Sequence, residues 1–148
     1  MVLGHERGRG HFLQAPGGCG KTFLLNCIID TVRSRGDIVL AVASTGVAAL
    51  LMEAGSTAHF RFKIPIPTTA ESTCRITPIS NAGQLLARAK LVVWDEAITT
   101  HRHAHEAVSR LEFLLYGGKT YCTIVQCCAR FYMFSRAFTR LFMLRYYT

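Results

Sequence analysis

The sequence has few acidic residues. Nine Asp and Glu stand against seventeen Lys and Arg in 148 residues, so the formal net charge is +8 at pH 7. Clustered positive charge attracts phosphate groups and speeds association, although it does not specify a fold. Five of the basic residues follow Gly118 with no acidic residue among them: Lys119, Arg130, Arg136, Arg140 and Arg145. The excess charge is therefore mostly a property of the C-terminal end, and it indicates an anionic partner only weakly.

Long apolar runs are also missing. No uninterrupted run approaches the roughly 18 apolar residues of a membrane-spanning helix, so no membrane segment is expected. The first ten residues contain Glu6, Arg7 and Arg9 without an apolar stretch, which argues against a secretory leader. The six cysteines form neither a Cys-x-x-Cys pair nor a spacing with histidine that is typical of a zinc site. These absences predict a reduced, intracellular compartment.

The pattern that is present is an alternation of short apolar runs and helical segments. Half of the residues are apolar, which is typical of a folded domain. Runs at His11–Gln14, Ile38–Ala43 and Leu91–Trp94 end at small or acidic residues, as buried parallel strands do. Helical spacing or composition marks Thr22–Val32 and Gly46–Glu53. This order predicts an α/β fold with a doubly wound, mostly parallel sheet.

One later segment departs from this alternation, and another resumes it. Residues 54–82 contain three of the four prolines and several serines and threonines, so we predict a long surface loop there. Helical spacing returns over Ala97–Leu115 and ends at two glycines. His101, His103 and His105 alternate within this helix, and residues two apart point in different directions. We therefore expect solvent-facing histidines there and no shared metal ion.

The strongest motif is the glycine-rich segment Ala15–Thr22, between a predicted strand and a predicted helix. Glycines let successive backbone N–H groups surround a phosphate, and the following helix directs its positive end at the anion. Lys21 would reach the β- and γ-phosphates, and the Thr22 hydroxyl would bind magnesium. Ala15 stands where the strict pattern has glycine, and a glycine-rich turn without a ligand is the alternative. The predicted nucleotide-binding residues are Gly17, Gly18, Cys19, Gly20, Lys21 and Thr22.

A second motif is the apolar run that ends in Asp95 and Glu96. Hydrolysis of a nucleotide needs a carboxylate that holds magnesium and a base that positions and deprotonates water. We assign the first role, as a metal ligand, to Asp95 and the second to Glu96. The predicted catalytic set is then Lys21, Asp95 and Glu96. The alternative is a solvated pair of acids at a helix start, where the helix dipole favours negative charge.

Further blocks carry a resemblance to a known family. Ser44–Ala49, Gly55–His59 and Phe62–Pro65 follow the second strand, and Arg33–Asp37 precedes it. Together with the two motifs above, in this order and spacing, they resemble the Pif-type DNA helicases of superfamily one, especially the branch associated with Helitron transposons. The resemblance extends from about Phe12 to Gly118.

The resemblance implies a RecA-like P-loop NTPase domain that uses ATP and Mg²⁺. It also implies ATP-driven 5′-to-3′ unwinding of DNA, roles in telomere maintenance, recombination and repair, and a nuclear location. Single-stranded DNA is then the expected partner, and Thr45, Gly46 and His59 lie in blocks that touch it. From the residues alone, Thr45 and Gly46 are equally a helix cap with its turn, and His59 is equally a buried, hydrogen-bonded imidazole.

The resemblance ends near Gly118. A family member would continue with a Gly-Asp-Phe-Arg-Gln block that senses the γ-phosphate and with a second motor domain, whereas here residues 120–128 read Thr-Tyr-Cys-Thr-Ile-Val-Gln-Cys-Cys. We predict an N-terminal extension at 1–10, a partial motor domain at 11–118 and a divergent, basic and aromatic tail at 119–148. A shifted reading frame, a basic amphipathic helix or a helix that covers the sheet could each account for the tail.

Three functional hypotheses follow from the sequence. The first is an incomplete ATP-dependent DNA helicase whose second motor domain must come from elsewhere. The second is another small P-loop nucleotide-binding protein or kinase, which suits the chain length but not the adjacent Asp95 and Glu96. The third is a DNA-binding remnant without catalytic activity. Stimulation of ATP hydrolysis by DNA would distinguish the first from the second, and thermal melting with and without MgATP would test the third.

Overall fold

The computed structural model describes residues 11–116 and 123–128 of the chain. Five strands form one sheet in the order β1-β5-β4-β2-β3, and every pair of neighbouring strands is parallel. The strands are β1 (His11–Gln14), β2 (Ile38–Ala43), β3 (Ser56–Thr57), β4 (Ala89–Asp95) and β5 (Thr123–Cys128). The helices are α1 (Lys21–Arg33), α2 (Gly46–Leu50), α3 (Ala58–Phe62), α4 (Asn81–Arg88), the 3₁₀ turn η1 (Ala97–Thr99) and α5 (Arg102–Tyr116).

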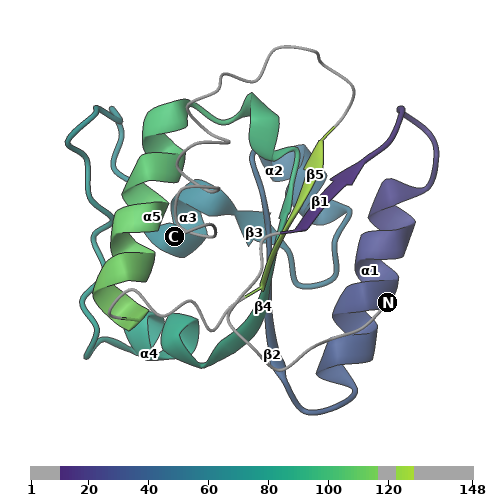
Figure 1. Cartoon of the computed structure of the whole chain (residues 1–148), viewed down its shortest axis with the longest axis horizontal. Helices are drawn as coiled ribbons and strands as arrows, with labels where there is room; N and C mark the ends of the chain where they lie inside the picture. The colour runs from purple at the N-terminus through teal and green to yellow at the C-terminus, as the bar shows by residue number, and fades with distance from the viewer. Residues whose placement is uncertain (1–10, 117–122, 129–148) are drawn as a thin grey trace, which may run out of the picture.

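Helices cover both faces of the sheet, as Figure 1 shows. Alternate residues of β2 point to opposite sides, so Leu40 and Val42 join a core cluster with α3, α4 and α5. Val39 and Ala41 join a second cluster with α1 and α2. The predicted doubly wound α/β architecture is confirmed, and its two cores explain why the strands read as continuous apolar runs.

The segment 54–82 is not a continuous loop, and this prediction was wrong. It contains β3, α3 and the start of α4. The threonines and serines that suggested a loop are partly helix caps: Thr57 Oγ1 accepts from the Phe60 N–H, and Ser80 Oγ accepts from the Gly83 N–H. Such side chains favour turns and helix starts equally, so their composition could not distinguish the two.

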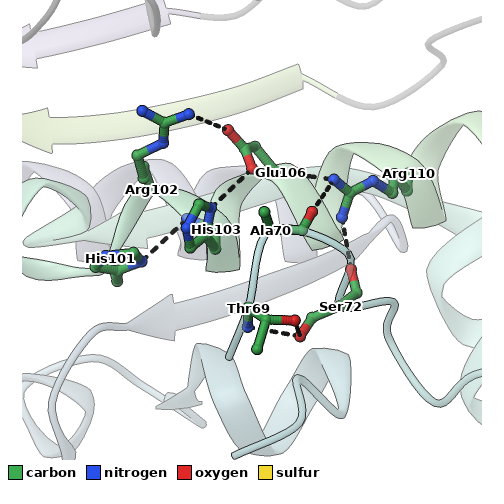
Figure 2. A network of polar contacts seen from close by, with 8 residues as sticks. All are labelled: Thr69, Ala70, Ser72, His101, Arg102, His103, Glu106 and Arg110. Carbon is green, nitrogen blue, oxygen red and sulfur yellow. Dashed lines mark hydrogen bonds and ion pairs between the residues drawn. The ribbon is translucent and has the colours of Figure 1, made fainter. Parts of the chain in front are cut away.

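The part of this segment that stays irregular is held against α5 (Figure 2). Arg110 donates from one guanidinium nitrogen to the Ser72 carbonyl over 2.6 Å and from the other to the Ala70 carbonyl. Glu106, one turn earlier on α5, lies 3.9 Å from Arg110 and 3.4 Å from Arg102. The guanidinium group of Arg110 thus holds the loop by two backbone carbonyls. A substitution of a loop side chain would leave these acceptors in place.

The sheet includes residues that the sequence analysis assigned to a tail. β5 lies within the segment 119–148, yet it pairs with β1 on one side and β4 on the other. Six residues after the predicted domain end at 118 therefore form an interior strand of the sheet. The remaining predictions for 1–10, 119–122 and 129–148 lie outside the described residues. Within the described ranges, no helix has the length and apolar character needed to cross a membrane.

Candidate nucleotide and DNA site

Parallel strands bring the candidate residues to one edge of the sheet, where the strands end. The glycine-rich loop follows β1, and the two acids follow β4. Leu13 on β1 and Asp95 on β4 both pair with Cys127 of β5, so their Cα atoms lie two strand spacings apart, about 10 Å. The loop and the acids therefore follow strands that end at the same edge of the sheet, with the single strand β5 between them (Figure 1).

The glycine-rich loop has the backbone that a phosphate cradle requires. Gly18 and Gly20 have φ angles of 72° and 80°, a left-handed conformation that L residues with a Cβ rarely adopt. A Cβ on Gly17, Gly18 or Gly20 would meet no protein atom within 4 Å, so the space beside the loop is open. The first turn of α1 contains no acidic residue that would compete with an anion for its positive end.

Lys21 folds back onto this loop. Its Nζ donates to the Pro16 carbonyl over 2.7 Å and to the Ala15 carbonyl over 2.9 Å. The Cys19 thiol also donates to the Pro16 carbonyl, over 2.9 Å. Thr22 lies beside Lys21 in the first turn of α1 and is partly buried. The ammonium group is thus present at the loop, held by weak neutral acceptors that a phosphate could replace.

Asp95 and Glu96 differ sharply in their surroundings. Asp95 is only 5% exposed, and its Oδ1 accepts from the Glu96 N–H over 2.9 Å. Glu96 is exposed and has a φ of 52°, an uncommon conformation for a residue with a side chain. Its carbonyl accepts from the Ser44 hydroxyl over 2.7 Å and from the Thr99 hydroxyl over 2.8 Å. Its backbone is therefore clamped at both ends while its carboxylate remains accessible.

The residues predicted to contact DNA follow β2 and β3, at the same carboxyl ends of the strands as the loop and the acids. Thr45 is exposed and caps α2, since its Oγ1 accepts from the Ala48 N–H over 3.2 Å, and Gly46 is the first residue of that helix. The helix-cap interpretation of Thr45 is thus correct, and a DNA contact through its exposed surface remains a prediction. His59 lies on α3, after the edge strand β3, and is partly buried.

One of the three alternating histidines, His105, does not face solvent, so that prediction was wrong for it. His105 is 7% exposed, its Nε2 lies 2.9 Å from the Ala97 carbonyl, and its ring packs on Trp94 at 4.5 Å between centroids. Burial lowers the pKa of His105, and the hydrogen bond with Ala97 opposes this in part. His103 is partly buried, 3.0 Å from Glu106. In the described part of the chain, no group of three potential metal ligands converges.

Sequence reasoning missed Phe60 and Ser44. The Phe60 ring is 64% exposed on α3, next to His59, and the Lys63 Nζ lies 4.2 Å from its centroid. An aromatic residue among basic residues is a signal for base stacking that was available in the sequence, whereas the exposure of the ring was not. Ser44 was noted only as the first residue of a block. Its contacts with Glu96 join two loops that are distant in sequence, so local patterns could not reveal them.

Comparisons with known proteins identify the family and the fold. The model of the PIF1-like helicase family matches residues 2–115. The ATP-dependent DNA helicase PIF4 of Trypanosoma brucei brucei is 30% identical over 119 residues, which covers 72% of this chain and 14% of PIF4. The chain therefore spans about a seventh of that relative's length.

Solved structures share the fold. The crystal structure of Bacteroides Pif1 bound to ssDNA matches with a TM-score of 0.69 and 21% identity, over 94% of this chain and 33% of that one. Pif1 helicase from Candida albicans matches with a TM-score of 0.63 and 21% identity, over 81% and 28% of the respective chains. A RecA-like fold of the Pif1 type is thus established independently of the motifs. Since the family model covers 114 of the 148 residues, the chain belongs to the PIF1-like helicase family.

Proposed function

We propose that this chain forms the nucleotide-binding lobe of an ATP-dependent DNA helicase. The observation that carries the proposal is the common register of Leu13 and Asp95, which sets the glycine-rich loop and the two acids on one sheet edge with one strand between them. A lysine beside left-handed glycines and a carboxylate pair at this separation suit binding and hydrolysis of a nucleoside triphosphate.

The residues fit ATP and Mg²⁺. The amides of Gly17, Gly18, Cys19 and Gly20 would surround the β-phosphate, and Lys21 would leave its loop carbonyls for the β- and γ-phosphates. The Thr22 hydroxyl and the buried Asp95 carboxylate supply oxygen ligands of the kind that Mg²⁺ prefers. The ion would neutralise charge on the phosphate oxygens. The exposed Glu96 carboxylate would position the attacking water and accept its proton.

Single-stranded DNA would lie along the other half of the edge, over Thr45, Gly46 and His59. Residues 56–70 contain Arg61 and Lys63 but no acidic residue, so this surface attracts phosphates. The exposed Phe60 adds a ring on which a base can stack. A Bacteroides Pif1 structure contains ADP-AlF3 and ssDNA together, and this chain matches its fold with a TM-score of 0.69.

Finer aspects of the proposal rest on the family resemblance. They are movement in the 5′-to-3′ direction, roles in telomere maintenance, recombination and repair, and a nuclear location. The described residues make up one lobe, whereas a helicase motor closes a cleft between two lobes around ATP. A second lobe would supply the arginine that stabilises the transferring phosphoryl group, which is worth roughly a thousandfold or more in rate. We therefore expect slow hydrolysis by this lobe alone.

The proposal is tested by nucleotide binding and DNA-stimulated hydrolysis. At a hundred times its dissociation constant, MgATP should raise the free energy of unfolding by about 2.7 kcal/mol. Lys21→Ala should abolish this gain, and Lys90→Ala should keep it, because Lys90 is exposed at the opposite end of β4. Equal stabilisation of the Lys21→Ala variant would contradict the proposed site. Hydrolysis stimulated by nucleosides rather than by single-stranded DNA would indicate a kinase instead.

A further inference from the structure

The Ser44 hydroxyl connects the two halves of the candidate site. Ser44 follows β2 and directly precedes Thr45, the cap of α2. Its Oγ donates to the Glu96 carbonyl over 2.7 Å and accepts from Trp94 Nε1 over 3.3 Å. The Thr100 hydroxyl lies 2.5 Å away and donates to the same oxygen. A hydroxyl has one proton and two lone pairs, so this network uses all of its hydrogen-bonding capacity.

Glu96 depends on this network for its conformation. A residue with a Cβ rarely holds a φ of 52° unless the surrounding structure imposes it. Asp95 engages the Glu96 N–H, and Ser44 engages its carbonyl. The Ser44 N–H also donates to the Asp95 carbonyl over 3.3 Å, which ties the end of β2 to the end of β4. A displacement of Ser44 must therefore alter the backbone that aims the Glu96 carboxylate.

Thr45, the residue after Ser44, is where single-stranded DNA would bind under the proposed function. Resting on the proposed function, we infer that Ser44 is a positioning residue that relays occupancy of the Thr45–Gly46 turn by single-stranded DNA to Glu96. The turn is exposed, whereas Trp94 and Thr100 behind it are buried and Ser44 is half-buried, so contact with DNA on the outside would shift groups on the inside. The relay would make the position of the proposed base depend on whether DNA is bound.

Trp94 provides a direct reporter of the relay. It is the single tryptophan of the chain, its indole N–H donates to Ser44, and it is 2% exposed. Bases cannot stack on a ring that is covered to this extent. A change in its fluorescence on addition of DNA must therefore be transmitted through the protein. The signal also needs no nucleotide and no hydrolysis.

The experiment measures DNA binding and Trp94 emission in the same samples. A short fluorescently labelled oligothymidylate is titrated into the full chain without nucleotide, with anisotropy reporting binding, and an unlabelled oligothymidylate is used for the tryptophan signal. We expect the Trp94 emission to shift with the same midpoint as the anisotropy. Ser44→Ala should lose this shift at saturation, and Ser44→Thr, which retains the hydroxyl, should restore it. Ser34→Ala is the matched control, because Ser34 follows α1 and bonds only within its own turn.

The outcomes separate the relay from the proposed function. Absence of DNA binding by the wild-type chain overturns both. Binding without a Trp94 shift overturns the relay alone, as does a full shift in Ser44→Ala. A merely structural role for Ser44 would lower the melting temperature of Ser44→Ala and leave the DNA-induced shift intact. If Ser44→Ala does not fold, the wild-type titration and Ser44→Thr still decide the question.

Discussion

The Lys21 ammonium group donates to the Pro16 carbonyl of its own loop over 2.7 Å. A second hydrogen bond, to the Ala15 carbonyl, holds it from the same side. Entry of a triphosphate must exchange these neutral carbonyl acceptors for anionic phosphate oxygens, which attract the ammonium charge more strongly. Without nucleotide, the loop thus holds the Lys21 ammonium group near its proposed ligand through neutral acceptors alone.

Nucleotide binding should therefore protect Cys19 from alkylation. Cys19 is exposed within the loop, whereas Cys27 is exposed on α1, away from it. We expect MgATP to slow labelling of Cys19 by iodoacetamide and to leave labelling of Cys27 unchanged, as read by peptide-resolved mass spectrometry. Cys74 should stay unlabelled throughout, because burial raises the pKa of its thiol to about 12. Protection that persists in Lys21→Ala would show that Lys21 is not needed to hold the nucleotide at the loop.

Replacement of the proposed base should separate binding from hydrolysis. Glu96→Gln keeps the side-chain shape but cannot accept a proton, so we expect hydrolysis to fall by at least about a hundredfold. The MgATP-induced rise in melting temperature should persist, because Glu96 is not assigned to phosphate binding. Glu53→Gln, another exposed glutamate, serves as the control for loss of charge. Hydrolysis by Glu96→Gln at the wild-type rate would remove Glu96 from the mechanism.

Truncation of Phe60 should weaken binding of single-stranded DNA. Stacking of one base on an aromatic ring is worth about 1–3 kcal/mol, so Phe60→Ala should raise the dissociation constant roughly 5- to 150-fold. The control is Phe113→Ala, since Phe113 is similarly exposed, at 56%, but lies on α5. Fluorescence anisotropy with a labelled oligonucleotide gives both values. Equal losses in the two variants would mean that Phe60 makes no specific contact.

The buried His105 should make stability fall in mild acid. Its pKa is lowered in the folded state, so below about pH 6.5 the unfolded chain binds more protons, and stability decreases as the pH falls. Glu106, whose pKa is lowered mainly by its hydrogen bond with His103, contributes only at more acidic pH. Thermal melting between about pH 7.5 and 5 should show the decline, and His105→Gln should reduce it. An unchanged slope in that variant would assign the effect to other histidines.

Local patterns predicted the principal elements well. The runs at His11–Gln14 and Ile38–Ala43 became strands with those bounds, and β4 begins only two residues before the predicted Leu91. Apolar residues with small or acidic terminators are short-range signals, and a strand buried on both faces needs little more. The glycines at 18 and 20 were equally predictable, because a left-handed turn before a helix strongly favours glycine.

Residue patterns that are compatible with two kinds of structure were misinterpreted. Thr57 and Ser80 counted toward a loop but cap α3 and α4. His105 appeared as one of three alternating polar residues, yet its ring is buried against Trp94. Trp94 belongs to β4, whereas His105 belongs to α5. A periodic pattern shows which residues share a face, but the partner that covers the face comes from another part of the chain.

By itself, the sequence determined the order of β1, α1, β2, α2, β4 and α5, the glycine-rich loop and the identity of the candidate residues, because each depends on neighbours within a few positions. Only the tertiary structure decided that β5 lies between β1 and β4, that Lys21 and the acids consequently share one edge, and that Ser44 bonds to Glu96. Pairing of parallel strands joins segments far apart in the chain, and its free energy depends on how all layers pack together. No local periodicity encodes that choice.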